Sequence, residues 1–163
     1  MTDNSIKIGH GYDVHRLQEG KDFFIGGIKI DHHKGAVGHS DADVAIHVIC
    51  DAMLGALSLG DIGAHFPDTD TKYKDIDSKI LLKKTHDLVR ENGYRVSNVD
   101  VTILLEKPKL RDHIDSMRGT LAKIIDIQTS QLSIKATTTE GLGFIGREEG
   151  VAAHCVCLLK NDA

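Results

Sequence analysis

The clearest pattern along the chain is an alternation of apolar and polar positions over residues 99–105, with an apolar side chain at every second place. A period of two residues is typical of a strand that is buried on one face. The alternation returns over residues 132–136, and between these segments apolar residues recur at helical spacing over residues 114–125. Strand, helix and strand in this order predict a crossover that joins two parallel strands.

Helical spacing of apolar residues predicts two more helices. One runs from Asp43 to about Leu57, with capping side chains in the preceding segment 40–43, and the other runs from Ser78 to Asn92. Gly93 follows the second helix and can adopt the left-handed conformation that ends a helix. Asp43, His47 and Asp51 lie four residues apart, so we expect one polar row along the first helix.

The two ends of the chain predict further strands. Residues 5–9 and 23–30 indicate short strands, the second interrupted by Gly26 and Gly27, with the glycine-rich segment 9–11 as a functional turn of a hairpin between them. A final strand over residues 151–159 follows another glycine-rich turn, and we expect it to pair antiparallel with the strand before it. Both of its faces are largely apolar, which predicts cover on both sides, one of them from another subunit.

The order of these elements predicts an α+β fold in a single domain, residues 1–163. We expect a mixed sheet of four to five strands with helices on one face and the other face packed in a closed homo-oligomer. Residues 60–74 contain glycine, proline and four aspartates without periodicity. Their length predicts a mobile, functional loop.

Composition excludes several classes of function. The chain is 40% hydrophobic and 27% charged, so a core can form without structural metal, and any metal is free to be functional. The formal net charge is −4 and the basic residues are scattered, so the sequence predicts no basic surface for binding nucleic acid or an anionic membrane. No apolar run is long enough to span a bilayer, and the first ten residues do not resemble a signal peptide.

Three cysteines, Cys50, Cys155 and Cys157, form an odd set, which favours a reducing cytoplasm over a disulfide framework. We expect the side chains of Cys155 and Cys157 to point to opposite faces of their strand. A bacterial cytoplasmic protein is the simplest interpretation, and a plastid protein from which a targeting peptide has been removed is the alternative.

Asp13, Val14 and His15 place two ligand-capable side chains on the same side of an extended segment. With His47 on the first helix they would make a zinc site of three protein ligands, which leaves a fourth position for substrate. The alternative is that Asp13 caps a turn and that the backbone satisfies both histidines.

Two further segments can bind phosphate. Residues 38–43 join a glycine to a helix start, where free N–H groups favour an anion, although an ordinary helix cap explains them equally well. Residues 135–141 leave a strand with three threonines and Glu140, so hydroxyls could hold phosphate while the carboxylate holds Mg²⁺ or Mn²⁺. The alternative is that threonines end the strand because of their β-propensity.

Four motifs in order, GHGYDVHR, GHSDADV, LGDIGAHFPDTD and KATTTEGLGFIGREEG, resemble the 2-C-methyl-D-erythritol 2,4-cyclodiphosphate synthases of the non-mevalonate isoprenoid pathway. The likeness covers nearly the whole chain. It implies a homotrimer with active sites between adjacent subunits. It also implies conversion of 4-diphosphocytidyl-2-C-methyl-D-erythritol 2-phosphate to the cyclic diphosphate with release of CMP.

The resemblance also implies roles for residues. Asp13, His15 and His47 would hold Zn²⁺, Glu140 would hold Mg²⁺ or Mn²⁺, and His39 and Thr138 would be catalytic by stabilising the phosphoryl group in flight. The remaining substrate-binding positions are Val14, Ser40 and Thr139, the loop residues Asp61, Ile62, Gly63, Phe66, Pro67, Asp68, Thr69 and Asp70, and a cytidine diphosphate pocket of Leu105, Glu106, Lys107, Pro108, Lys109, Leu110, Arg111, Ala136 and Thr137.

Three of these interpretations have alternatives that the sequence leaves open. Phe144 and Arg147 match positions that line an axial cavity associated with isoprenoid diphosphates, but an apolar plug and a surface arginine would also explain them. Asp51 could support His47 or be a solvated helix carboxylate. The chain as a whole could instead be a zinc phosphohydrolase, or a non-catalytic trimeric module that binds metals or isoprenoid diphosphates.

Overall fold

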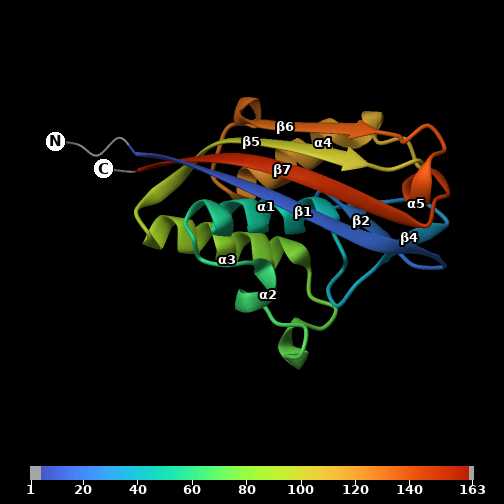
Figure 1. The fold of residues 1–163 in the computed structure, drawn as a ribbon, viewed down its shortest axis with the longest axis horizontal. Helices are drawn as coiled ribbons and strands as arrows, with labels where there is room; N and C mark the ends of the chain where they lie inside the picture. Colours follow the sequence, from blue (N-terminus) through green and yellow to red (C-terminus); the bar gives the residue numbers. More distant parts are fainter. Residues whose placement is uncertain (1–4, 162–163) are drawn as a thin grey trace.

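A mixed five-stranded sheet with helices on one face forms the body of the molecule in the computed structural model, which describes residues 5–161 (Figure 1). The strand order is β4-β1-β7-β5-β6. These strands are β1 (Ile6–Glu19), β4 (Lys34–Val37), β5 (Tyr94–Leu104), β6 (Leu132–Thr137) and β7 (Gly150–Asn161). The covering helices are α1 (Val44–Ala56), α3 (Ser78–Glu91) and α4 (Ile114–Ile124).

The shorter elements connect this framework. A two-stranded sheet is formed by β2 (Phe23–Ile25) and β3 (Ile28–Ile30). The remaining segments of helix are α2 (Ile62–His65), η1 (Thr71–Tyr73), η2 (Arg111–His113), η3 (Thr129–Gln131) and α5 (Gly143–Gly146). The predicted loop over residues 60–74 therefore contains two short helices, α2 and η1.

The crossover predicted from periodicity is confirmed. β5 pairs parallel with β6 from Val99 opposite Leu132 to Leu104 opposite Thr137, and α4 connects the two strands. The helices predicted at residues 43–57 and 78–92 are also present, and Gly93 has a φ of 78° after α3. These elements were predictable because each has a regular local pattern of apolar residues.

The prediction that the final strand pairs with its predecessor was wrong. β7 lies between β1 and β5 and is antiparallel to both. β7 is a twelve-residue strand. In its central position, its backbone forms hydrogen bonds with a neighbouring strand on each side. β6 is half as long and exposes Ser133 and Lys135, features typical of an edge strand.

The glycine-rich segment predicted as a turn lies inside a strand. β1 runs without a break for 14 residues, and Gly9 and Gly11 face α1. A Cβ atom at Gly9 would lie 1.8 Å from the carbonyl oxygen of Ala52, and one at Gly11 would lie 2.1 Å from that of Val48. These glycines are therefore required by the close approach of the helix. The hairpin turn lies instead at residues 26–27, between β2 and β3.

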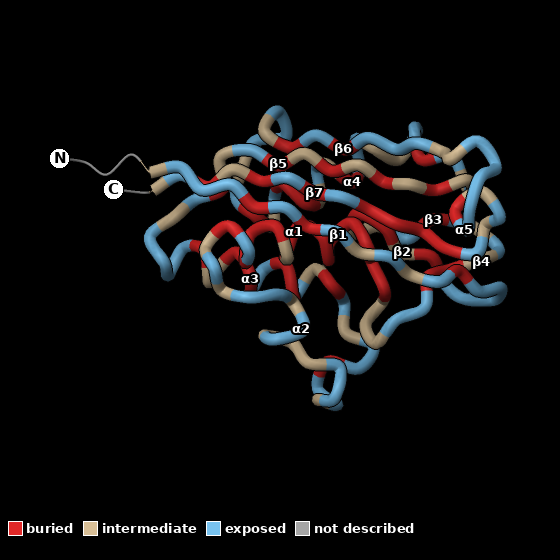
Figure 2. The backbone as a smooth tube through the Cα atoms, in the orientation of Figure 1, coloured by how far each residue is buried: buried red, intermediate tan, exposed pale blue. Residues whose placement is uncertain are grey.

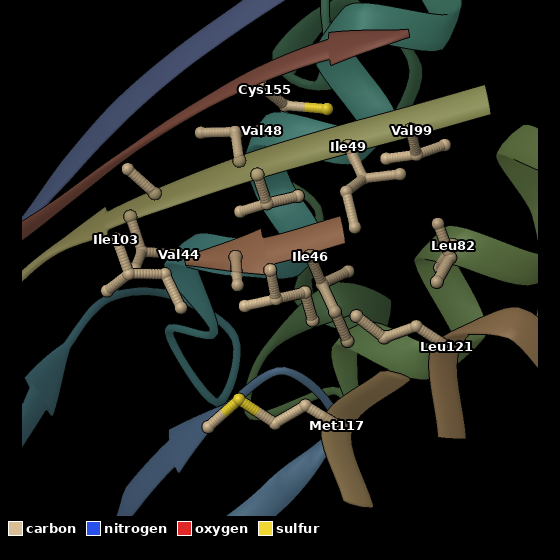
Figure 3. Close-up of a cluster of buried hydrophobic side chains, with 14 of the residues drawn as sticks. Val44, Ile46, Val48, Ile49, Leu82, Val99, Ile103, Met117, Leu121 and Cys155 are labelled. Atoms are coloured by element: carbon tan, nitrogen blue, oxygen red, sulfur yellow. The ribbon is translucent and has the colours of Figure 1, made fainter. Parts of the chain in front are cut away.

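Helix α1 is the centre of the core (Figures 2 and 3). Eleven of its thirteen residues are buried, because β1 and β7 cover one side and α3 packs on another. Cys155 and Cys157 both lie on the helix-covered face of β7 and are buried. Our expectation that they point to opposite faces was wrong, because residues two apart in a strand share a face. Burial raises the pKa of Cys157 to about 12, so the thiol stays protonated.

Asp43 caps α1 from a buried position. Its carboxylate accepts hydrogen bonds from the backbone N–H groups of Ile46 at 3.1 Å, Gly26 at 2.9 Å and Gly27 at 2.6 Å, and burial raises its pKa. Asp43 therefore points to the β2–β3 hairpin and does not belong to the predicted polar row with His47. Since its side chain already bonds the first turn, the cap interpretation holds for Asp43, and phosphate binding by His39 and Ser40 stays a prediction.

The opposite face of the sheet is open in the single chain. Its exposed apolar residues come from β1 and β7, with exposed fractions of 61% for Ile6, 70% for Ile8, 50% for Tyr12 and 41% for Val156. Exposed apolar residues gathered on one face, here with His10 and His154 between them, are typical of an interface between subunits. Across residues 5–161, the structure has no helix with the length and apolar character needed to cross a bilayer.

We predict that Gly11→Ala destabilises the protein, because the new methyl group must displace the backbone of α1. The free energy of unfolding should fall by about 2–3 kcal/mol, measured by urea denaturation at fixed protein concentration. The control is Gly119→Ala on the exposed side of α4, where a Cβ meets nothing within 4 Å. Its effect should be a gain of up to about 1 kcal/mol. Equal effects of the two changes would contradict the packing argument.

Candidate metal centre and active site

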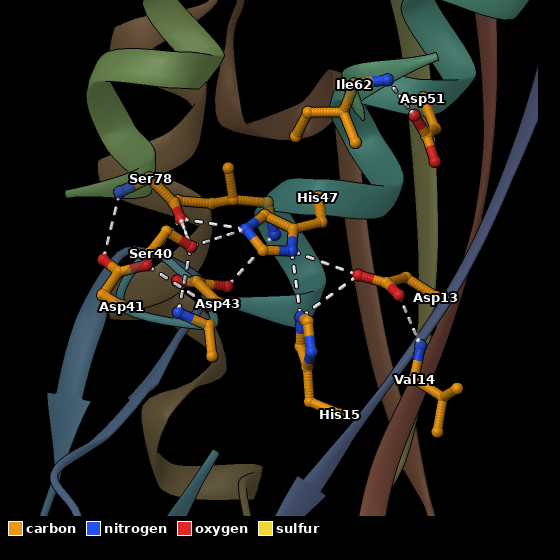
Figure 4. A network of polar contacts seen from close by, with 12 residues as sticks. Asp13, Val14, His15, Ser40, Asp41, Asp43, His47, Asp51, Ile62 and Ser78 are labelled. Atoms are coloured by element: carbon orange, nitrogen blue, oxygen red, sulfur yellow. Dashed lines mark hydrogen bonds and ion pairs between the residues drawn. The ribbon is translucent and has the colours of Figure 1, made fainter. Parts of the chain in front are cut away.

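Three possible metal ligands converge between β1 and α1 (Figure 4). Asp13 and His15 lie on the helix-facing side of β1, and His47 projects toward them from α1. His15 Nε2 is 2.9 Å from His47 Nδ1, and Asp13 Oδ2 is 3.1 Å from each of these nitrogens. Ligands with zinc bonds of about 2.0–2.2 Å in a tetrahedral site lie about 3.3 Å apart. The three donor atoms therefore fit a zinc-type ion.

The protonation of Asp13 suits this role. Burial alone would raise the pKa of its carboxyl group, but hydrogen bonds with His15 and His47, and their charges, outweigh burial and hold the pKa well below its ordinary value. The group is thus an anion at neutral pH and can bind a cation directly. Asp13 lies within a strand, so the alternative that it caps a turn does not hold. Oδ1 accepts a bond from Val14 N at 2.7 Å.

His47 is held from its other side by two hydroxyl groups. Its Nε2 lies 3.1 Å from Ser40 Oγ and 3.1 Å from Ser78 Oγ. Ser78 in turn donates its hydroxyl hydrogen to Asp41, so its oxygen is free to accept the Nε2 proton of His47. This arrangement leaves the Nδ1 lone pair directed at the metal position, as supporting partners of metal-bound histidines do. Neither Ser78 nor Asp41 was among the predicted site residues.

The triad opens into a cleft of about 450 Å³. His39 and Ser40 line the cleft beside the triad, and in the described part of the chain His39 Nε2 is buried without a hydrogen-bond partner. An unpaired buried nitrogen is available to a ligand. Six of the predicted loop residues form part of the wall, namely Ile62, Gly63, Phe66, Pro67, Asp68 and Thr69. Tyr73, Ile76 and Leu81, which were not predicted, also line the cleft.

Aspartates hold the loop that forms this wall. Asp51, one turn beyond His47, accepts a hydrogen bond from Ile62 N at 2.8 Å, and burial raises its pKa. It therefore anchors α2 to α1, a role different from both interpretations of the sequence. Asp61 and Asp70 cap α2 and η1, which accounts for both carboxylates structurally.

A second cleft, of about 730 Å³, matches the predicted cytidine diphosphate pocket. The predicted residues that line it are Leu105, Pro108, Lys109, Leu110, Arg111, Ala136 and Thr137. Thr138, Asp112, Ile114 and Lys135 complete the lining. Glu106 instead accepts a hydrogen bond from Thr139 N at 3.2 Å, and Lys107 forms an ion pair with Glu148 at 3.0 Å.

The proposed second-ion ligand lies apart from the triad within one chain. Thr138 donates a hydrogen bond to Glu140 at 3.1 Å at the end of β6. For residues 5–161, the 450 Å³ and 730 Å³ clefts share no lining residue. Glu140 itself is not among the described residues that line the triad cleft.

A third cleft, of about 330 Å³, opens on the uncovered face and includes Phe144, Tyr12 and His154. Arg147 is not part of its lining and pairs with Glu149 through two contacts of 3.0 Å. Val14 also lies on this face, with its side chain 42% exposed. Only its backbone can face the triad.

The family model described as the YgbB family matches residues 6–160. The chain belongs to the YgbB family. Among similar proteins, 2-C-methyl-D-erythritol 2,4-cyclodiphosphate synthase of Bacteroides thetaiotaomicron is 55% identical over 157 residues, covering 96% of this chain and 99% of that protein. The synthase of the same name from Syntrophomonas wolfei is 54% identical over 155 residues, covering 95% of this chain and 99% of that protein.

Solved structures of family members share the fold. The bifunctional IspDF of Campylobacter jejuni has a TM-score of 0.94 and 42% identity over 98% of this chain, which spans only 43% of that longer protein. IspF of Plasmodium falciparum in complex with CDP has a TM-score of 0.86 and 32% identity, covering 99% of this chain and 100% of that one. The resemblance and the fold class inferred from sequence are thus confirmed.

We predict that Zn²⁺ stabilises metal-stripped protein through the triad. At free Zn²⁺ of about 100 times the dissociation constant the gain should be about 2.7 kcal/mol, seen as a higher melting temperature in calorimetry at fixed protein concentration. His15→Ala should remove the part of this gain that comes from the triad, because two donors hold the ion much less tightly than three. His113→Ala, which is not one of the three candidate ligands, is the control. An unchanged gain in His15→Ala would contradict the assignment.

Proposed function

We propose that this member of the YgbB family converts 4-diphosphocytidyl-2-C-methyl-D-erythritol 2-phosphate into 2-C-methyl-D-erythritol 2,4-cyclodiphosphate and CMP, as a phosphorus–oxygen lyase. The observation that carries the proposal is the convergence of Asp13, His15 and His47 beside the unpaired Nε2 of His39. The relatives that bear the name of this synthase match more than nine-tenths of the chain.

The complete active site forms between subunits of a homotrimer in this proposal. Two observations support it: the apolar face of β1 and β7 lacks a cover within the described residues, and the triad cleft is separate from the cleft at residues 105–111. Docking one subunit's triad cleft against a neighbour's second cleft would provide room for a substrate with a nucleotide at one end and a phosphate at the other.

The donor atoms at each position indicate which metal ion it would bind. Two imidazoles and a carboxylate at tetrahedral spacing suit Zn²⁺, whereas the exposed carboxylate of Glu140 beside a threonine hydroxyl suits Mg²⁺ or Mn²⁺. When bound, such ions neutralise the negative charge of the diphosphate and of departing CMP.

The chain's own residues position a reaction that needs no enzyme nucleophile. An oxygen of the 2-phosphate attacks the β-phosphorus, the bond from that phosphorus to the oxygen of the CMP phosphate breaks, and CMP leaves with the electron pair. Holding the two ends together can contribute about 7–11 kcal/mol in well-oriented intramolecular reactions. His39, Ser40 and Thr138 supply the hydrogen bonds that orient the phosphoryl group.

Residues around the metal centre bind the other parts of the substrate in this proposal. Asp61, Gly63, Phe66 and Asp68 contact the methylerythritol part, and residues 105–111 with Ala136 and Thr137 contact the cytidine diphosphate. Phe144 and Arg147 border an axial cavity that accepts an isoprenoid diphosphate. The protein works in the bacterial cytoplasm.

The direct test is to incubate purified protein and Mg²⁺ with the cytidylylated methylerythritol phosphate and to follow phosphorus resonances before and after chelation. We expect CMP and a cyclic diphosphate, and their loss after chelation. A linear phosphate carrying oxygen from labelled water would show a hydrolase instead. Metal binding without turnover would indicate a binding module.

We predict that His39→Ala lowers kcat by about 100-fold, the order expected for losing one hydrogen-bond donor to a developing charge. Bound zinc, measured by elemental analysis, should stay at the wild-type level, because His39 is not one of the three ligands. His39→Gln, which keeps a donor, should retain more activity than His39→Ala. Loss of zinc in His39→Ala would count against the catalytic role.

A further inference from the structure

A second group of ligand-capable side chains lies outside the proposed active site. His32 and His33 belong to the segment that joins β3 to β4, and Glu148 belongs to the turn between α5 and β7. Their ligand atoms all lie within 4.8 Å of one another. None of the three lines the clefts described above. Glu148 lies within the fourth sequence motif, but the resemblance implies no role for it or for the two histidines.

His32 has an unfilled bonding position. In the described part of the molecule its Nε2 is buried and has no hydrogen-bond partner, although buried polar atoms of native proteins are normally paired. The rings of His32 and His33 are 4.3 Å apart between centroids and inclined at 63°. Two imidazoles are thus already held beside one another at this position.

The backbone of Glu148 is held next to these rings. The ammonium group of Lys34, the residue after His33, donates a hydrogen bond to the Glu148 carbonyl oxygen at 3.0 Å. Glu148 has a φ of 56°, a conformation that costs a non-glycine residue energy and persists only where surrounding contacts hold it. The Glu148 backbone is therefore held beside the histidine pair, and in the structure its carboxylate lies within 4.8 Å of their ligand atoms.

Lys107 is the present partner of that carboxylate. Its Nζ lies 3.0 Å from Glu148 Oε1, and 65% of its side chain is exposed. The lysine side of this pair is open to solvent, which weakens the pair, whereas the Glu148 side chain is 21% exposed. A cation of higher charge density can therefore compete with Lys107 for the carboxylate. The freed carboxylate and the exposed His33 can then rotate to close the donor atoms around an ion.

We propose that His32, His33 and Glu148 form a second site for a divalent ion of the zinc class, separate from the triad. Two imidazoles and one carboxylate are a donor set typical of Zn²⁺, Co²⁺ and Ni²⁺, with water completing the coordination, and they select against Mg²⁺. Binding would release Lys107, whose neighbour Pro108 lines the 730 Å³ cleft. This inference does not depend on the proposed function.

The test is metal uptake by the full-length protein. Metal-stripped protein is titrated with Zn²⁺ against a chromogenic chelator, with excess Mg²⁺ present throughout. His33→Ala should take up one equivalent per chain fewer than the wild type, whereas His113→Ala should match the wild type. His15→Ala should lose a different equivalent, so that the double variant with His33→Ala lacks both. Lys107→Gln should bind the second ion several-fold more tightly.

Circular dichroism separates loss of the metal site from loss of the fold, because only variants with the wild-type spectrum are compared. Uptake by His33→Ala equal to that of the wild type would overturn the proposal. An equal loss in His113→Ala would also overturn it, by showing that histidines bind zinc at this surface without a built site. Unchanged affinity in Lys107→Gln would overturn the competition between the ammonium group and the ion.

Discussion

The close approach of helix α1 to strand β1 is the contact on which the rest of the structure depends. It requires that Gly9 and Gly11 carry no side chain, because a Cβ atom there would overlap the carbonyl oxygens of the helix. Two and four residues beyond Gly11, the same face of the strand carries Asp13 and His15. The packing that allows the helix to lie on the strand backbone therefore also places His47 within 3.1 Å of both donors.

Helix α1 then organises the surroundings of the candidate site. Its N-cap, Asp43, joins the helix to the β2–β3 hairpin, and Asp51 anchors the loop at Ile62. Between them, His47 receives support from hydroxyl groups of two other segments. Because one nearly buried helix carries all three contacts, the metal ligands, their supporting hydroxyls and the cleft wall are held in a single rigid frame.

Local patterns predicted much of the fold, and contacts between distant segments explain the errors. The helices and the β5–β6 crossover have periodic apolar residues, so their sequence alone indicates them. A glycine pair in β1 has the same local appearance as a turn, and only the packing of α1 distinguishes the two. The central place of β7 depends on its neighbours β1 and β5, which no local pattern specifies.

The candidate site was also predictable only in those parts that a local pattern indicates. The spacing of Asp13 and His15 predicts a shared face, and the motifs identify the family. Ser78 and Asp41 could not be found in this way, because Ser78 contacts His47, and Asp41 contacts Ser78, only after α3 packs beside α1. Glu140 does not line the triad cleft in the described part of one chain, so a single chain does not test its predicted role.

The central claim is that the α1–β1 contact builds a metal centre. Anomalous diffraction at the zinc absorption edge, from crystals of the protein grown with Zn²⁺, tests it most directly. We expect an anomalous peak about 2.0–2.2 Å from Asp13 Oδ2, His15 Nε2 and His47 Nδ1. Zinc bound elsewhere, with these three side chains still hydrogen-bonded to one another and no anomalous peak between them, would contradict it.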